Sequence, residues 1–158
     1  MSTHLPIAVP VTLPASTRVG VVAARWNADI VDELLRGCVE RLKERGVSEA
    51  NILVHRVPGA FELPVAAKWL AEAGCDAVVC LGCVVRGDTP HFDYVAGEAA
   101  RGINQVGLQT GVPIVFGVLT TNTEQQAKDR AGGTHSHGGI NSADAAVEMI
   151  AVKHAIGG

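Results

Sequence analysis

Four short apolar segments alternate with segments of helical periodicity, and this alternation constrains the fold more than any other feature of the chain. The apolar segments are "RVGVVAA" (18–24), "ANILVHRV" (50–57), "DAVVCLGCVV" (76–85) and "VPIVFGVLT" (112–120). The first is nearly continuous in apolar residues, as expected of a strand that is buried on both faces of a sheet. Strands that alternate with helices over short connections predict a parallel sheet with helices on both faces. We therefore expect an α/β fold with a four-stranded parallel sheet.

The segments between these strands carry apolar residues at helical spacing, and cap residues mark several of their ends. Asn27 is the expected N-cap of the first helix, and Gly46 its expected end. Gly74 closes the second helix, and Thr123 is placed to cap the fourth. The five expected helices span about 28–45, 63–73, 92–106, 123–131 and 141–155.

Length and composition limit the classes of protein that need to be considered. The chain has 158 residues, a net charge of −3 and 47% hydrophobic residues besides 18 glycines. This length suits one domain, and the charge offers no basic surface for nucleic acid. No apolar stretch reaches the roughly 18 residues of a membrane-spanning helix, and the N-terminus lacks the layout of a signal peptide. We therefore expect a cytoplasmic protein that binds neither nucleic acid nor membrane.

Three prolines, Pro6, Pro10 and Pro14, occupy the first part of the chain. Proline lacks the backbone N–H that helices and sheets use. We therefore expect residues 1–16 to form an extended arm and residues 17–158 to form a single domain.

Cysteines occur at positions 38, 75, 80 and 83, and Cys80 and Cys83 form a CxxC motif. This pair lies inside an expected strand, where residues three apart point to opposite faces of the sheet. A redox CxxC opens a helix instead, and a zinc site needs a second pair of ligands. We expect buried thiols that pack as small apolar residues, and no metal.

The turns that follow the strands are where chemistry is expected, because parallel α/β sheets bind ligands beyond the carboxyl ends of their strands. These turns are "RWNAD" (25–29), "VPGAFELP" (57–64), "VVRGDTPH" (84–91) and "LTTNTE" (119–124). The chain has neither GxGxxG nor a P-loop motif, so a dinucleotide or triphosphate site is not expected.

The third turn has features of a phosphate site. Backbone N–H groups from Gly87, Asp88 and Thr89 can point at one anion, and a helix N-terminus behind them adds partial positive charge. His91 titrates near neutral pH and can move protons. The alternative interpretation is a polar turn in which Thr89 is an N-cap, Pro90 the first helical residue, and His91 a solvated side chain.

Aromatic residues at other expected strand ends indicate a site for a flat ring. Phe61 can stack on such a ring while Glu62 makes hydrogen bonds, and Trp26 and Phe116 also fall at predicted strand ends. The alternative is that Phe61 anchors the core and Glu62 starts a helix, where negative charge is favourable.

Four stretches in the same order and at similar spacing resemble one known family. They are "GAFELP" (59–64), "RGDTPHFDYV" (86–95), "FGVLTTNTEQQAKDRAG" (116–132) and "AAVEMI" (145–150). Over nearly all residues after 16 the chain resembles the 6,7-dimethyl-8-ribityllumazine synthases of riboflavin biosynthesis. The resemblance implies a flavodoxin-like three-layer sandwich.

The resemblance also implies an activity. The family condenses 5-amino-6-(D-ribitylamino)uracil with 3,4-dihydroxy-2-butanone 4-phosphate and releases phosphate and water, without a metal or a redox cofactor. Two alternatives are a non-catalytic flavin- or phosphate-binding module and a structural shell protein of the same fold. The presence of both His91 and Arg130 favours the enzyme over these alternatives.

Site residues carry over from the family by position. His91 matches a proton-transfer histidine, Arg130 a phosphate-binding arginine, and Gly87–Thr89 the phosphate turn. The residues implied to contact the pyrimidine and its ribityl chain are Trp26, Asn27, Ala60, Phe61, Glu62, Cys83, Val84, Val85 and Phe116.

The resemblance implies a homo-oligomer as well, either a pentamer or a sixty-subunit icosahedral shell, with riboflavin synthase as a candidate partner. The active sites would lie between subunits. Phe116 and Arg130 would come from one subunit and most other site residues from its neighbour.

One stretch, "RAGGTHSHGGIN" (130–141), departs from the family pattern. Thr134 and Gly138 stand where the family commonly has lysines near the phosphate. Either His135 or His137 replaces that charge when it is protonated, or both are loop residues and Arg130 suffices. A planar guanidinium can bind phosphate through two parallel hydrogen bonds, which makes the second alternative reasonable.

Overall fold

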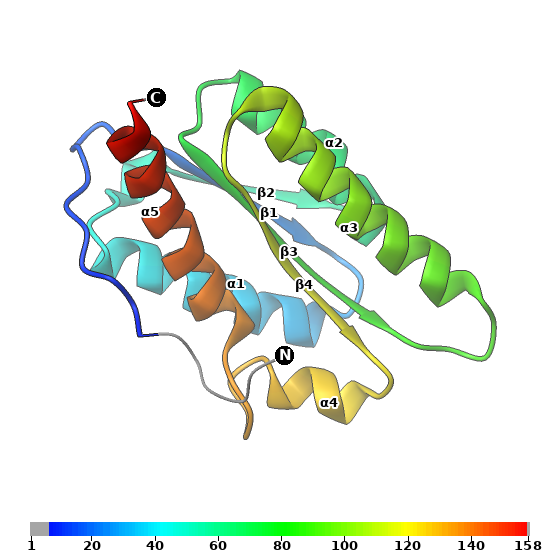
Figure 1. The fold of residues 1–158 in the computed structure, drawn as a ribbon. Helices are drawn as coiled ribbons and strands as arrows, with labels where there is room; N and C mark the ends of the chain where they lie inside the picture. Colours follow the sequence, from blue (N-terminus) through cyan, green and yellow to red (C-terminus); the bar gives the residue numbers. More distant parts are fainter. Residues whose placement is uncertain (1–6, 158) are drawn as a thin grey trace.

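Four parallel strands form the centre of the molecule in the computed structural model, which describes residues 7–157. The strands are β1 (Val19–Ala24), β2 (Ile52–Val57), β3 (Ala77–Val85) and β4 (Ile114–Thr121), in the sheet order β2-β1-β3-β4 (Figure 1). Every pairing is parallel. The four-stranded parallel sheet predicted from the apolar segments is confirmed.

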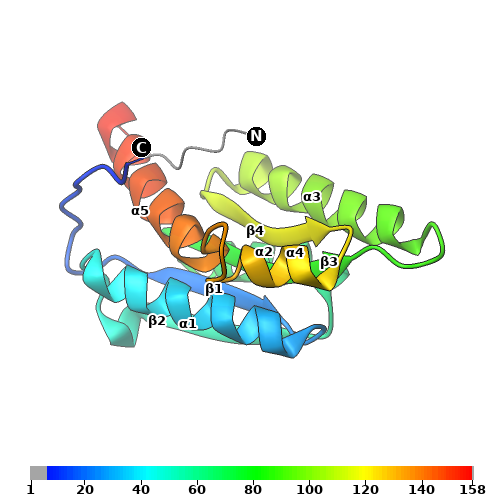
Figure 2. The same cartoon turned by 90° about the horizontal axis from the view of Figure 1, so that it is seen from below.

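Helices cover both faces of this sheet and make the three layers of a flavodoxin-like sandwich. On one face lie α1 (Ala28–Glu44), α5 (Gly138–Ile156) and the short α4 (Glu124–Asp129) (Figures 1 and 2). On the other face lie α2 (Leu63–Glu72) and α3 (His91–Thr110). Two 3-10 turns, Glu49–Asn51 and Ala60–Glu62, precede β2 and α2. The predicted fold class is confirmed.

The core consists of two apolar clusters because side chains alternate along each strand. Val21 of β1 packs beneath α1 and α5, whereas its neighbour Val22 packs beneath α2 and α3. The CxxC pair obeys the same rule, since Cys83 belongs to the first cluster and Cys80 to the second. The expectation that these two thiols lie on opposite faces of the sheet is confirmed.

One helix differs from the sequence prediction in how its N-terminus is capped and another in where it begins, and each difference involves a side chain with a distant partner. Asn27 precedes α1, but its side chain does not cap the helix; its backbone is left-handed, with φ of 57°. Its predicted N-cap position is therefore confirmed, whereas its side chain makes no capping hydrogen bond. The last helix begins at Gly138 and not near Asn141, because the His137 ring accepts a hydrogen bond from the Ile140 N–H (3.2 Å) and caps it.

The other predicted caps are confirmed. The Thr123 hydroxyl accepts a hydrogen bond from the Gln126 N–H at 3.1 Å. Gly46 and Gly74 follow α1 and α2 with φ of 97° and 98°, the left-handed conformation that glycine adopts at helix ends.

The described part of the predicted arm runs along the face formed by α1 and α5. Residues 7–14 have no helix or strand, and the Val9 N–H donates to Glu148 Oε1 (2.8 Å) while Arg45 donates to the Val9 carbonyl (2.6 Å). Val11 and Leu13 pack against the core. Residues 1–6 of the arm lie outside the described residues, so the division of the chain at residue 16 stays a prediction. No helix in the described part is long and apolar enough to cross a membrane.

The structure predicts that the thiols react slowly in the folded protein. All four cysteines are free and buried, and burial raises the pKa of Cys38 and of Cys80 to about 12 and that of Cys83 to about 11. Since the thiolate is the nucleophile, alkylation near pH 8 should be far slower in the native protein than after unfolding in denaturant. Mass spectrometry of labelled protein checks this, and rapid native labelling of any cysteine would contradict the packing described here.

Candidate active site at the carboxyl ends of β1 and β3

A cavity of about 400 Å³ opens where β1, β2 and β3 end. It is bounded by the three turns that follow these strands and by the start of α3. Nine sequence-predicted residues line it, namely Trp26, Asn27, Ala60, Phe61, Glu62, Cys83, Val84, Val85 and His91. Sequence reasoning missed Gly59 and Val95. Val95 could have been found, because it lies four residues after His91 and so on the same face of a helix.

The cavity exists because β3 is longer than β1. Their pairing ends at Ala23 and Leu81, while β3 continues to Val85 beside β4. One side of residues 83–85 therefore has no neighbouring strand among the described residues. Buried backbone carbonyls need a hydrogen-bond partner, and the Asn27 side-chain amide supplies one by donating to the Cys83 carbonyl at 2.8 Å. The left-handed turn at Asn27 thus replaces the missing strand and leaves open space beyond it.

Two aromatic rings stand at the mouth of this cavity with large exposed surfaces. Trp26 is 73% exposed and Phe61 is 58% exposed. A Cβ at Gly59 would lie 3.3 Å from the Trp26 ring, so glycine at this position lets the indole lie close to the turn. Exposed rings of this kind can stack on a flat ligand. The alternative interpretation, in which Phe61 anchors the core, is therefore wrong.

Glu62 stabilises the turn that carries Phe61. Its Oε2 accepts a hydrogen bond from the Gly59 N–H at 2.9 Å, and its own N–H donates to the Gly59 carbonyl at 3.2 Å. A carboxylate at the start of a helix is favourable there as well. Glu62 therefore has the structural role that the sequence left open, while its side chain also lines the cavity.

His91 is the first residue of α3, and its exposed side chain reaches the cavity wall. The preceding turn, residues 86–90, is exposed. The Thr89 hydroxyl lies 3.4 Å from the His91 N–H, at the long end for a hydrogen bond. The helix begins at His91, with Pro90 as its cap residue, one position later than the alternative interpretation expected.

Arg86 connects this turn to the end of β4 and to the first turn of α3, and the sequence did not predict this role. Its guanidinium donates to Asn122 (3.1 Å) and to Asp93 (3.3 Å), and it lies over the Phe92 ring at 4.3 Å. Asp93 and Phe92 belong to the first turn of α3, next to His91. Arg86 thus links the end of β4 to the helix turn that carries the histidine.

Several predicted site residues do not line the cavity: the phosphate turn Gly87–Thr89, His135 and His137, and also Phe116 and Arg130. Phe116 is not at a strand end as predicted: it is the third residue of β4, paired in register with Cys80, and it is 45% exposed. Arg130 follows α4, and its guanidinium donates to the Gln126 carbonyl at 3.0 Å. Neither lines the cavity. The structure therefore divides the predicted site into two groups on one chain.

The two histidines of the 130–141 stretch have different environments. His135 is exposed. The side chain of His137 is only 12% exposed, and both of its ring nitrogens have partners: Nδ1 lies 3.2 Å from the Ile140 N–H and Nε2 lies 3.2 Å from Glu33 Oε1. Because neither nitrogen is left for a ligand, the geometry does not support His137 as a phosphate-binding residue.

A family model and three similar proteins all carry the same description. A model of the family described as 6,7-dimethyl-8-ribityllumazine synthase matches residues 16–154. The protein of that name from Parabacteroides distasonis is 50% identical over 133 residues, which cover 84% of this chain and 83% of the relative. The protein of that name from Porphyromonas gingivalis is 47% identical over 86% of this chain and 85% of the relative. The one from Cytophaga hutchinsonii is 48% identical over 86% of this chain and 87% of the relative.

The chain belongs to the 6,7-dimethyl-8-ribityllumazine synthase family. The resemblance predicted from the motifs is confirmed. The chain is therefore an enzyme, a transferase of riboflavin biosynthesis, and not one of the non-catalytic alternatives.

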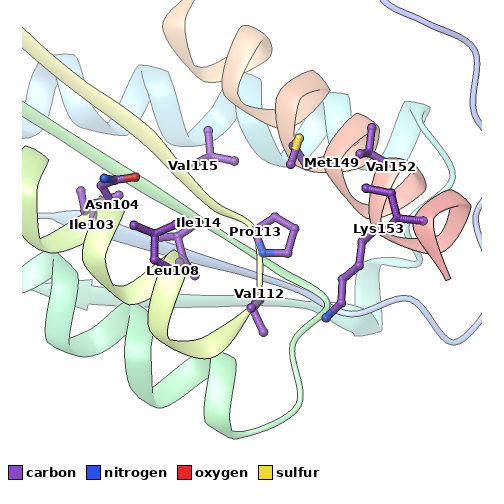
Figure 3. A pocket seen from close by; sticks show the side chains of 13 residues that line it. Ile103, Asn104, Leu108, Val112, Pro113, Ile114, Val115, Met149, Val152 and Lys153 are labelled. Atoms are coloured by element: carbon purple, nitrogen blue, oxygen red, sulfur yellow. The ribbon is translucent and has the colours of Figure 1, made fainter. Parts of the chain in front are cut away.

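A second cavity, of about 380 Å³, lacks the features expected of an active site in this family. It lies between α3, the start of β4 and α5 (Figure 3), and its only polar side chains are Asn104 and Lys153. Met149 and Val152 of α5 lie opposite Pro113 and Ile114 (Figure 3). Converging polar groups mark ligand sites, and here there are almost none. In residues 7–157, no three His, Cys, Asp or Glu side chains gather as a metal site requires.

Substitutions at Asn27 test how the cavity is held open. Asn27→Ala removes the hydrogen bond to Cys83 and places an alanine in left-handed backbone, so we expect a loss of about 2–3 kcal/mol in unfolding free energy. Asn27→Gly removes the same hydrogen bond but tolerates the backbone, so the loss should be smaller, about 1–2 kcal/mol. Denaturant unfolding of both variants measures this difference. Equal losses would mean that the left-handed turn does not matter.

Proposed function

We propose that the protein condenses 5-amino-6-(D-ribitylamino)uracil with 3,4-dihydroxy-2-butanone 4-phosphate to give 6,7-dimethyl-8-ribityllumazine, phosphate and water. The observation that carries the proposal is the cavity at the ends of β1 and β3. In a chain of this family, it brings together two exposed aromatic rings and a histidine at a helix start. No metal or redox chemistry is needed for this condensation.

The cavity suits the pyrimidine substrate. The rings of Trp26 and Phe61 can stack on a flat heterocycle, and Val84 and Val85 offer an apolar wall at the open edge of β3. Asn27 lies at the same wall, with its amide donating to Cys83. We assign pyrimidine and ribityl binding to this group, which also includes Ala60, Glu62 and Cys83.

We assign the phosphate to the Gly87–Thr89 turn and to Arg130. The turn precedes the N-terminus of a long helix, where backbone N–H groups and the helix dipole favour an anion. A guanidinium adds a permanent charge that stabilises the departing phosphate. We also assign His135, which is exposed, to the phosphate site, where its protonated ring would add positive charge.

The reaction follows from these assignments. The pyrimidine amine attacks the ketone carbon, and loss of water gives an imine. Elimination then breaks the C–O bond to phosphate, and the second nitrogen closes the ring with loss of water. His91 moves protons in these steps, while most of the acceleration comes from holding two small molecules together.

We infer that the complete site forms between two copies of the chain. Phe116 and Arg130 lie outside the cavity of their own chain, on β4 and after α4. Large apolar side chains are also exposed far from the cavity, such as Trp69, Leu108 and Ile156. Exposed apolar surface of this kind marks protein contacts. A neighbouring copy would cover this surface and bring its Phe116 and Arg130 to the cavity.

A pentamer is the smallest assembly that we propose, and an icosahedral sixty-subunit shell built from pentamers is the larger alternative. Riboflavin synthase, which would consume the product, is the proposed partner. We place the enzyme in the cytoplasm, where four free thiols stay reduced.

Replacing His91 tests the catalytic assignment. With both substrates present, the parent should form the fluorescent lumazine product. His91→Ala should lower kcat about 10- to 100-fold, because positioning remains while proton transfer is lost, and the KM for the pyrimidine should change little. His154→Ala, which removes an exposed histidine at the end of α5, serves as the control. An unchanged rate in His91→Ala would refute its role.

Mixing two variants of low activity tests the shared site. His91→Ala and Arg130→Ala chains, refolded together in equal amounts, should form some sites that combine native His91 of one copy with native Arg130 of its neighbour. Random assembly gives about one quarter of sites of this kind, so activity should rise to about a quarter of that of the parent. If both residues act within one chain, the mixture will show only the average of the two variants.

A further inference from the structure

The loop that follows Arg130 is closed by backbone hydrogen bonds at its base. The Gly138 N–H donates to the Arg130 carbonyl at 2.8 Å, and Ala131 forms an antiparallel bridge with His137. Inside the loop, the Gly132 N–H donates to the Ser136 carbonyl at 2.9 Å. Arg130 therefore sits at one end of a closed turn, and His137 sits at the other.

The His137 ring packs between α1 and this turn, and two glycines make room for it. A Cβ at Gly37 of α1 would lie 2.2 Å from His137 Cε1, closer than any real contact allows. A Cβ at Gly132 would lie 3.1 Å from His137 Cδ2. The imidazole is thus held between α1 and the loop by close packing.

The two partners of the ring specify its protonation state. The Ile140 N–H is a donor only, so Nδ1 must accept and carry no proton. Arg36, which is bidentate to Glu33, holds the pKa of that carboxyl at about 2, and the His137 hydrogen bond adds to the effect. Glu33 is therefore ionised and accepts only, so Nε2 must donate its proton. Only the neutral Nε2–H tautomer satisfies both contacts.

We propose that His137 is a positioning residue for the phosphate-binding half of the site: its neutral ring caps α5, ties the loop to Glu33 of α1 and thereby holds Arg130 in place. This inference rests on the proposed role of Arg130. It replaces the idea that His137 contacts phosphate, because such a contact needs a free ring N–H: the Nε2–H already donates to Glu33, and Nδ1, which accepts from the Ile140 N–H, carries no proton.

The inference predicts a selective defect. His137→Ala should raise the KM for the butanone phosphate about 2- to 30-fold, the range that loss of one N-cap corresponds to. The KM for the pyrimidine should stay within about twofold, because β1, β3 and α3 build that cavity without the loop. His137→Asn should restore most of the lost affinity, since asparagine is among the best N-caps.

A second variant tests the packing of the His137 ring against α1 without replacing the histidine. Gly37→Ala keeps His137 but displaces its imidazole, so it should reproduce the KM defect of His137→Ala. Displacing the ring costs about 1–3 kcal/mol, and the gain of about 1 kcal/mol in helix propensity offsets part of that cost, so this variant should stay folded. Gly97→Ala is the matched control, because a Cβ there has no neighbour within 4 Å.

The outcomes separate the inference from the function on which it rests. A parental KM for the butanone phosphate in Gly37→Ala, or equal KM changes for both substrates, would overturn the positioning role. Failure of asparagine to rescue would overturn the capping role. If Arg130→Ala keeps the parental KM for the butanone phosphate, the phosphate assignment itself fails, and absence of lumazine from the parent refutes the proposed reaction.

Discussion

The site depends on the unequal lengths of two paired strands. β1 and β3 share the centre of the sheet, but β3 continues past the end of β1 to Val85. At that point the backbone of β3 needs a partner that a strand no longer provides, and Asn27 supplies it through a left-handed turn. The same turn places Trp26 at the cavity mouth, close to the turn that carries Phe61. A hydrogen-bonding requirement of the sheet thus shapes the binding surface.

The sequence predicted the strands and most residues that line the cavity at their carboxyl ends, because both follow from local patterns. Continuous apolar segments indicate buried strands, and the carboxyl ends of parallel strands meet at one edge of the sheet. The roles of Asn27, Arg86 and His137 could not be predicted in this way. Each depends on a partner distant in sequence: Cys83 for Asn27, Asn122 for Arg86, and Glu33 for His137. Tertiary contacts of this kind have no signal in spacing or periodicity.

The division of the predicted site into two groups connects the fold to its assembly. One chain supplies a cavity for a flat ring at the carboxyl ends of β1 and β3, and its Phe116 and Arg130 lie elsewhere. In the assembly that we propose, a second copy would resolve this separation and would also cover apolar surface such as that of the cavity between α3 and α5. Under this proposal, oligomerisation and catalysis depend on one another, since the neighbouring copy would complete the site.

The most direct test of this account is a crystal structure of the assembled protein soaked with the pyrimidine substrate and inorganic phosphate. The account predicts the pyrimidine ring against Trp26 and Phe61 of one chain, and phosphate between the Gly87–Thr89 turn of that chain and Arg130 of its neighbour. A pyrimidine bound in the apolar groove, or a phosphate whose turn and arginine come from the same chain, would contradict it.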